Sequence, residues 1–242
     1  MNTLHTTGGT TRKPRYLIWS YDYSHASSGP KALHRLCHEL RLAGQDAYVG
    51  WPVTNPDWDT PHFDGPITDD VIAVYPEIVA GNPYKAKRVA RWVLNVPGKL
   101  GGDKVYDPSE MVFTWDRSLV DAPLLNIPHI ETDIYTDRGE PREGELVYFG
   151  KGSGNVAGTE ITLEMRLDRH ALADALNHAT LLRCFDDFSG MVGIALLCGC
   201  PVEIVPTGQR YDPAGFREAY LALRPVFLQQ LARFVEITQA AA

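Results

Sequence analysis

The chain has 242 residues, of which 44% are hydrophobic and 22% are charged, and this composition excludes collagen-like, disordered and disulfide-framework proteins. Its formal net charge is −7, so the protein lacks the overall positive charge that is typical of a general nucleic-acid-binding protein. The charge is uneven, with 13 Lys and Arg against 14 Asp and Glu in residues 1–121, and 10 against 16 in residues 122–242. An anionic partner would therefore bind the first half.

The start of the chain and the cysteines indicate where the protein works. Residues 1–14 are polar and have no apolar stretch behind a basic start, which predicts a disordered tail and no export signal. No run reaches the roughly 18 apolar residues of a membrane span. The four cysteines lack the paired spacing of zinc sites and the density of a disulfide framework. We therefore expect a cytoplasmic protein with reduced thiols and no membrane span.

Apolar runs separated by helix-like or connecting segments predict a parallel sheet in residues 15–132. The runs are 16–21, 47–51, 71–75, 92–96, 111–115 and 124–127. Between the first two runs, residues 29–43 place apolar side chains on one helical face, and Gly44 is a typical stop signal. This pattern predicts a first Rossmann-like lobe that begins with a β-α-β unit.

A second series predicts a similar lobe in residues 145–212. Strands are expected at 145–149, 159–163, 180–185 and 201–205, and helices at 168–179 and 191–197. The charged segment Asp133–Gly144, punctuated by Pro and Gly, is the predicted hinge. Residues 213–242 are helical in pattern, and Pro225 should kink this helix as it returns to the first lobe. The expected fold class is α/β, with two Rossmann-like lobes facing a cleft.

A glycine-rich turn follows the strand predicted at 145–149. Its residues are Gly150, Lys151, Gly152, Ser153 and Gly154. Glycines let the backbone approach an anion and Lys151 adds a positive charge, so the turn could cradle a diphosphate. Asn155 stands at the third glycine position of a dinucleotide fingerprint, which argues against a dehydrogenase. A plain turn that ends a strand is the alternative.

A second motif spans residues 184–202, where a strand ends in Asp186 and Asp187, a Ser189-Gly190 turn follows, and an apolar helix comes next. Ligands of open α/β sheets bind beyond the carboxyl ends of the strands, so these polar groups should line a cleft. The alternative is that the aspartates only cap the helix.

This run resembles the donor-site signature of GT-B glycosyltransferases, especially those of family 4 type, in which an acid, a Gly-rich turn and a helix precede a Cys-Gly-x-Pro-Val strand. Here that last element is Cys198 to Val202. The segments Ser27–Leu36, Val74–Pro83 and Tyr148–Gly152 are similar to other parts of such enzymes, including compact viral ones. The chain departs from the pattern at Ile194, where the family has a second acid, and at Val156, where it has a second basic residue.

The resemblance implies a GT-B-like fold and transfer of a sugar from a nucleotide-sugar donor to a hydroxyl acceptor, with no other cofactor and no metal. The implied donor-binding residues are Gly29, Gly150, Lys151, Gly152, Asp186, Asp187, Ser189 and Gly190. Asp22, His25 and Glu77 each follow a predicted strand of the acceptor lobe, so they are the candidates for acid or base catalysis. The alternative left open by Ile194 is a non-catalytic nucleotide- or nucleotide-sugar-binding protein.

Two acceptors remain open, a glycan and a hydroxymethylated DNA base. The candidate acceptor-binding residues are Asn82, Lys85, Arg88 and Arg91. Arg88 and Arg91 belong to a run of six cations between Lys85 and Lys104 that could contact phosphates, although such a run is usually a solvated helix face.

Two patterns could hold a metal. Asp57-Trp58-Asp59 is an Asp-x-Asp in a turn-rich loop, and His34 and His38 lie four residues apart on the predicted helix. A solvated turn and partly buried histidines are the preferred interpretations.

Overall fold

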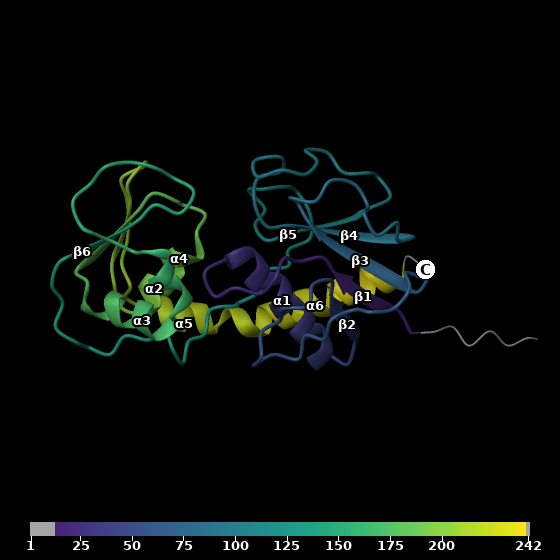
Figure 1. Ribbon diagram of the computed structural model, residues 1–242, viewed down its shortest axis with the longest axis horizontal. Coiled ribbons are helices and arrows are strands. Elements are labelled where there is room, and N and C mark those ends of the chain that lie inside the picture. Colours follow the sequence, from purple (N-terminus) through teal and green to yellow (C-terminus); the bar gives the residue numbers. More distant parts are fainter. Residues whose placement is uncertain (1–12, 241–242) are drawn as a thin grey trace, which may run out of the picture.

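Two five-stranded sheets, each with its own hydrophobic core, make up residues 13–240, which the computed structural model describes (Figure 1). The predicted tail at residues 1–14 lies almost wholly outside the described residues. The first lobe contains β1 (Arg15–Ile18), α1 (Ser28–Leu42), β2 (Asp46–Val49), β3 (Val71–Pro76), β4 (Arg88–Val93) and β5 (Met111–Thr114). The fold is therefore α/β, with mostly parallel sheets.

The second lobe begins at β6 (Glu145–Tyr148). It continues through β7 (Thr159–Glu160), α2 (Leu163–Leu167), α3 (Arg169–His178), β8 (Leu181–Cys184), α4 (Gly190–Leu197), β9 (Val202–Ile204) and β10 (Gln209–Tyr211). Two helices follow, α5 (Phe216–Leu221) and α6 (Leu223–Ala240).

The strand orders give each sheet a point where the chain reverses its direction of winding. The first sheet has the order β2-β1-β3-β4-β5 and is parallel throughout. The second has the order β10-β9-β8-β6-β7, with only β10 antiparallel. Reversal falls between β1 and β3 in the first sheet and between β6 and β8 in the second. Such switch points are where α/β sheets bind ligands.

The predicted first helix forms because its apolar side chains fall on one face. Ala32, Leu33, Leu36 and Leu40 are buried in the first core, which also contains side chains of all five strands. Gly44 follows the helix with φ of 72°, a left-handed conformation that glycine adopts without steric cost. Its N–H donates to the carbonyl of Arg41, which closes the last turn.

Two predicted strands of the first lobe are corrected. The fourth strand was expected at 92–96 but runs from Arg88 to Val93, so two of the six cations of the basic run lie in a strand. The segment 124–127 makes only a single bridge, between Leu124 and Thr114. Leu125 and Ile127 are nevertheless fully buried in the first core.

The predicted hinge at 133–144 packs on the second lobe instead. Tyr135 is 1% exposed within the second core, and the Arg138 N–H donates to the Asn177 side chain of α3 at 2.8 Å. Arg142 donates to the carbonyls of Leu176 and Cys198. The chain passes between the lobes earlier, because Ile127 belongs to the first core and Ile130 packs on the second.

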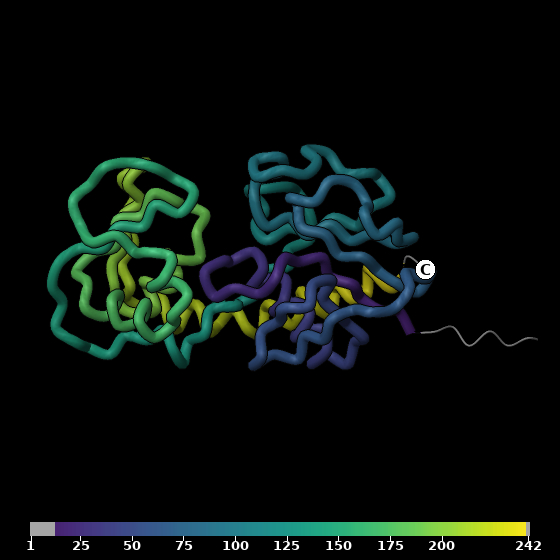
Figure 2. The backbone as a smooth tube through the Cα atoms, in the orientation of Figure 1, coloured from purple at the N-terminus to yellow at the C-terminus, as the bar shows by residue number. Residues whose placement is uncertain are grey.

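The C-terminal helices connect both lobes. Phe216 and Tyr220 of α5 pack on the second core, whereas Phe227, Leu231 and Phe234 of α6 are buried in the first. Figures 1 and 2 show α6, in yellow, passing from one lobe to the other. The break falls at Ala222 and not at Pro225, because Pro225 lies in the first turn of α6 and has no N–H for the carbonyl of Leu221.

The four cysteines, Cys37, Cys184, Cys198 and Cys200, are buried and form no disulfide. Along residues 13–240, none of the helices combines the length and apolar character that crossing a bilayer would require.

Candidate active site

A pocket of about 450 Å³ lies between the two lobes, at the carboxyl ends of the strands of both sheets. From the first lobe, residues that follow β1, β3, β4 and β5 line it, and the second lobe contributes residues that follow β6 and β8. The first turns of α1 and α4 also line this pocket. Both switch points and two helix N-termini therefore bound one space, whose size is typical of a small-molecule site.

The glycine-rich turn after β6 contributes Lys151 to the pocket, but its glycines serve packing. A Cβ on Gly152 would lie 2.4 Å from the carbonyl oxygen of Phe185, and one on Gly150 would lie 2.7 Å from the Asp186 side chain. Asp186 is buried, and its Oδ2 accepts the backbone N–H of Lys151 at 3.2 Å. Gly150, Gly152 and Asp186 do not line the pocket. These three residues fix the turn, and donor contacts by them stay a prediction.

The start of α4 is the second part of this lobe that lines the pocket. Asp187, Ser189 and Gly190 line the pocket, and Asp187 is exposed. Ser189 is the N-cap, and its Oγ accepts the Met191 N–H at 3.2 Å. Ser189, and not Asp186 or Asp187, therefore caps α4, and Ser189 also lines the pocket. Because Gly190 is in the first turn, its N–H points out of the helix end, where anions are stabilised.

Glu77 is the one predicted catalytic residue that reaches the pocket. Its side chain is 3% exposed, and Oε2 accepts the Leu94 N–H at 2.9 Å. Burial raises the pKa of Glu77, and the positive charge of Lys151 across the pocket partly opposes that shift. A carboxyl group with a raised pKa in a cleft is typical of general acid or base catalysis.

Asp22 and His25 lie outside the pocket, which corrects the expectation that they face it. Asp22 is exposed, and its Oδ1 accepts the Val53 N–H at 3.3 Å. His25 makes an edge contact with the ring of Tyr23 and lies near Arg169 and Glu131, away from the strand ends. The loop after β1 turns back, so only Trp19 and Tyr21 of its first residues reach the pocket.

His129 is a pocket residue that sequence reasoning missed. Its Nδ1 is 3.3 Å from the carbonyl oxygen of Ile127. A carbonyl oxygen only accepts hydrogen bonds, so the proton of the neutral ring lies on Nδ1. Nε2 is then a hydrogen-bond acceptor. Burial lowers the pKa of His129 to about 4, so the ring is neutral near pH 7. Its place in the sequence could have identified His129. It follows the apolar run 124–127, in the same way that the other candidates follow predicted strands.

The predicted acceptor-binding residues are not brought together at the pocket. Arg91 is fully buried, pairs with Glu110 at 2.8 Å, and donates to the carbonyls of Val79 and Gly81. Arg88 is 9% exposed and donates to the carbonyl of Asp69.

The other two acceptor candidates follow β3, outside the pocket lining. The amide oxygen of Asn82 accepts the Tyr75 hydroxyl and the Ala86 N–H, so this side chain holds the turn together. Lys85 is exposed in that turn. Two of the four candidates, Arg88 and Arg91, are therefore buried in β4, and acceptor binding by Asn82 and Lys85 stays a prediction.

The two metal-like patterns have other partners. Asp59 pairs with Arg41 at 2.6 Å and Asp57 with Arg169 at 3.7 Å. His34 is fully buried, and the Nδ1 of His38 accepts the Asp59 N–H at 3.0 Å.

One further group of side chains in residues 13–240 has the spacing to share an ion. It consists of Glu140, Asp174 and His178, outside the pocket lining. Arg138 contacts both of its carboxylates and so offsets one of their two negative charges.

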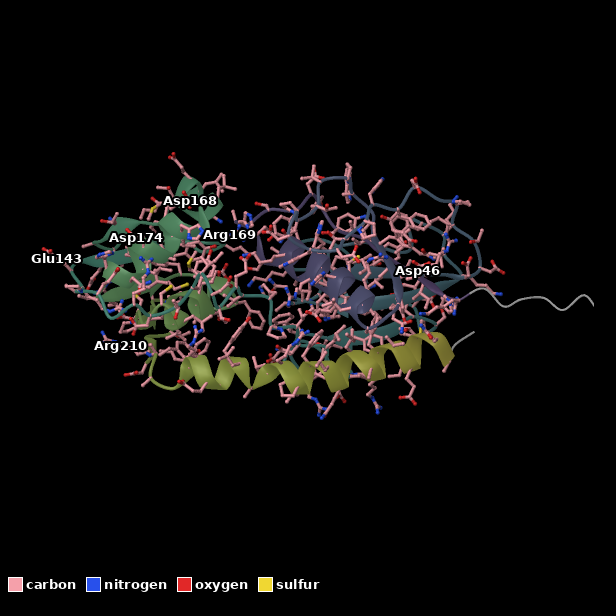
Figure 3. The ribbon with its side chains drawn as sticks, turned by 90° about the horizontal axis from the view of Figure 1, so that it is seen from below. Asp46, Glu143, Asp168, Arg169, Asp174 and Arg210 are labelled. Carbon is pink, nitrogen blue, oxygen red and sulfur yellow. The ribbon has the colours of Figure 1, made fainter. Side chains whose placement is uncertain are left out.

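Several contacts lie where the two lobes meet. The guanidinium of Arg166 donates to the carbonyl of Ala26 at 3.1 Å. Arg169, on the side of the second lobe that faces the first in Figure 3, pairs with Glu131 and Asp57. Ser28 lies so close to Gly190 that a Cβ there would be 2.8 Å from the serine oxygen. The starts of α1 and α4 therefore nearly touch.

Comparison with known proteins adds no family. No protein-family model matches the chain, and no curated protein sequence is significantly similar to it.

Proposed function

We propose that the chain is a glycosyltransferase that moves a sugar from a nucleotide-sugar donor to a hydroxyl acceptor. The observation that carries this proposal is that the switch points of both parallel sheets border one pocket. Each switch point is a ligand position, so the pocket suits a reaction between two bound molecules better than binding of one.

The donor binds against the second lobe. Its diphosphate would accept the Gly190 N–H at the start of α4 and pair with Lys151, while the exposed Asp187 would accept hydroxyl protons of the sugar. Negative charge develops on the diphosphate as the bond to the sugar breaks. Lys151 and the N-terminus of α4 would stabilise that charge.

The acceptor binds against the first lobe, with Glu77 as the base. The acceptor oxygen forms a bond to the anomeric carbon, the bond between that carbon and the diphosphate oxygen breaks, and the acceptor proton moves to the Glu77 carboxylate. The nucleoside diphosphate leaves with the bonding electrons. Glu77 suits the role because burial raises the pKa of its carboxyl group, which strengthens it as a base.

The second candidate function is non-catalytic binding of a nucleotide or nucleotide sugar. Ile194, in the position of the second acid, is buried in the second core, so α4 offers no carboxylate there to hold a ribose. Donor binding without turnover would favour this candidate.

Calorimetry with nucleoside diphosphates tests the donor site. Replacing Lys151 with Ala should weaken binding by about 1.5–3 kcal/mol, the range for a hydrogen bond to a charged group. The matched control is Lys85→Ala, which removes an exposed lysine outside the pocket and should leave affinity unchanged. Turnover is measured separately as diphosphate released from nucleotide sugars. Equal affinity of the Lys151→Ala protein and the wild type would contradict the assigned donor site.

A further inference from the structure

Three aromatic residues extend from the pocket across the surface of the first lobe, and we call Trp19, Tyr21 and Trp51 the aromatic strip. The rings of Trp19 and Tyr21 are 4.8 Å apart and those of Tyr21 and Trp51 are 6.5 Å apart. Trp19 and Tyr21 line the pocket, and Tyr21 and Trp51 are 54% and 41% exposed. Large aromatic side chains in contact with one another and with solvent are typical of a binding surface.

The backbone holds the strip in place. The loops that follow β1 and β2 run side by side, with the Gly50 N–H donating to Ile18 at 2.9 Å and the Tyr23 N–H donating to Val53 at 2.8 Å. Asp22 lies between Tyr21 and Tyr23 in sequence and accepts the Val53 N–H. The strip is thus a fixed platform beside a carboxylate, and it is built before a ligand arrives.

Charge decides which acceptor suits this platform. Three carboxyl groups line the pocket, those of Glu77, Asp116 and Asp187, against the single cation Lys151. If the donor diphosphate uses Lys151, no lysine or arginine of the lining remains for the phosphates of DNA. A duplex would meet carboxylates here, including exposed Asp22, and its binding depends on many cationic contacts.

We infer that the acceptor is a neutral carbohydrate whose ring stacks on the aromatic strip. The apolar C–H face of a pyranose packs against an aromatic ring, and carboxylates such as Asp22 accept its hydroxyl protons. The strip would hold the sugar with one hydroxyl directed into the pocket toward Glu77. The role of this sugar as an acceptor rests on the proposed function. Binding of the sugar to the aromatic strip does not require turnover.

The test uses methyl glucosides, galactosides and mannosides of both anomeric forms as probes, observed by saturation-transfer NMR on the full chain. We expect at least one to bind, and Tyr21→Ala and Trp51→Ala to raise its dissociation constant about five-fold or more, the size typical of losing one stacked ring. Tyr21→Phe keeps the ring and should bind like the wild type. Tyr211→Ala removes an exposed ring in β10 and is the matched control.

A hydroxymethylated DNA duplex is titrated in parallel by fluorescence anisotropy. Saturable duplex binding that Tyr21→Ala leaves intact, absence of binding by every glycoside, or glycoside binding unchanged in both alanine variants would each overturn the inference. Calorimetry with nucleoside diphosphates on the same proteins separates the two proposals. If no diphosphate binds but glycosides do, and depend on the strip, then the proposed function fails and the carbohydrate site stands.

Discussion

The two lobes have the same kind of sheet, and both end their strands at one pocket, but they bring opposite chemistry to it. The first lobe contributes a buried carboxyl group, Glu77, and an apolar aromatic surface. The second contributes Lys151 and the start of α4, where the N–H of Gly190 lies at the positive end of the helix. The lobes therefore share the position of their strand ends, and the side chains after each strand give each lobe's side of the pocket its own chemistry.

The two lobes also differ in how far a positively charged side chain is buried. Arg91 of the first lobe is fully buried and surrounded by Glu110 and backbone carbonyls, whereas Lys151 of the second is exposed at the pocket. The first charge is paired inside the fold, whereas the second faces the pocket. Three experiments on variants test this difference between the lobes.

The largest effect is expected at the pocket face of the first lobe. Glu77→Gln should lower kcat by about 10²–10⁴-fold, the usual contribution of a positioned base. Burial raises the pKa of Glu77 above its ordinary value of 4.5, and only the ionised form is a base. The wild-type rate should therefore fall as the pH drops through that raised pKa, and the variant should lose this acid limb. An unchanged kcat in the variant would transfer the role of base to the neutral imidazole of His129.

The next effect concerns stability. Arg91→Met should lower the free energy of unfolding by about 3–5 kcal/mol, because it leaves Glu110, which is 7% exposed, as a buried charge without its partner. Urea denaturation followed by tryptophan fluorescence measures this loss. Lys151→Met is the matched control and should stay within about 0.5 kcal/mol of the wild type, as exposed substitutions do. Similar losses in both variants would end the distinction between the two charges.

The smallest effect contrasts two glycines near the pocket. Gly152→Ala should destabilise the protein by about 1–3 kcal/mol, because its Cβ would lie 2.4 Å from the Phe185 carbonyl oxygen. Gly29→Ala, at the start of α1, has no atom within 4 Å and should be neutral or stabilise by about 0.4–1 kcal/mol. Thermal unfolding compares the two variants. If Gly152→Ala is tolerated as well as Gly29→Ala, then the turn after β6 is not fixed by packing on Phe185.

Much of the framework could be predicted from the sequence, because the signals that define it are local. The spacing of Ala32, Leu33, Leu36 and Leu40 identified α1, and Gly44 identified its end. Strand ends followed by polar residues identified Glu77, Lys151 and Ser189, all of which line the pocket. Helical period, strand period and turn residues act within a few positions of the chain, so one sequence suffices to detect them.

What the sequence alone did not determine depends on contacts between distant residues. The sequence alone predicts that Arg91 is a surface cation. In the structure it is buried against Glu110 and the carbonyls of Val79 and Gly81. The aromatic strip exists only because the loops after β1 and β2 are hydrogen-bonded to each other, and His129 reaches the pocket only because residues 124–127 pack into the first core. A charged or aromatic side chain can be buried or exposed according to its distant neighbours, and the tertiary fold alone supplies those neighbours.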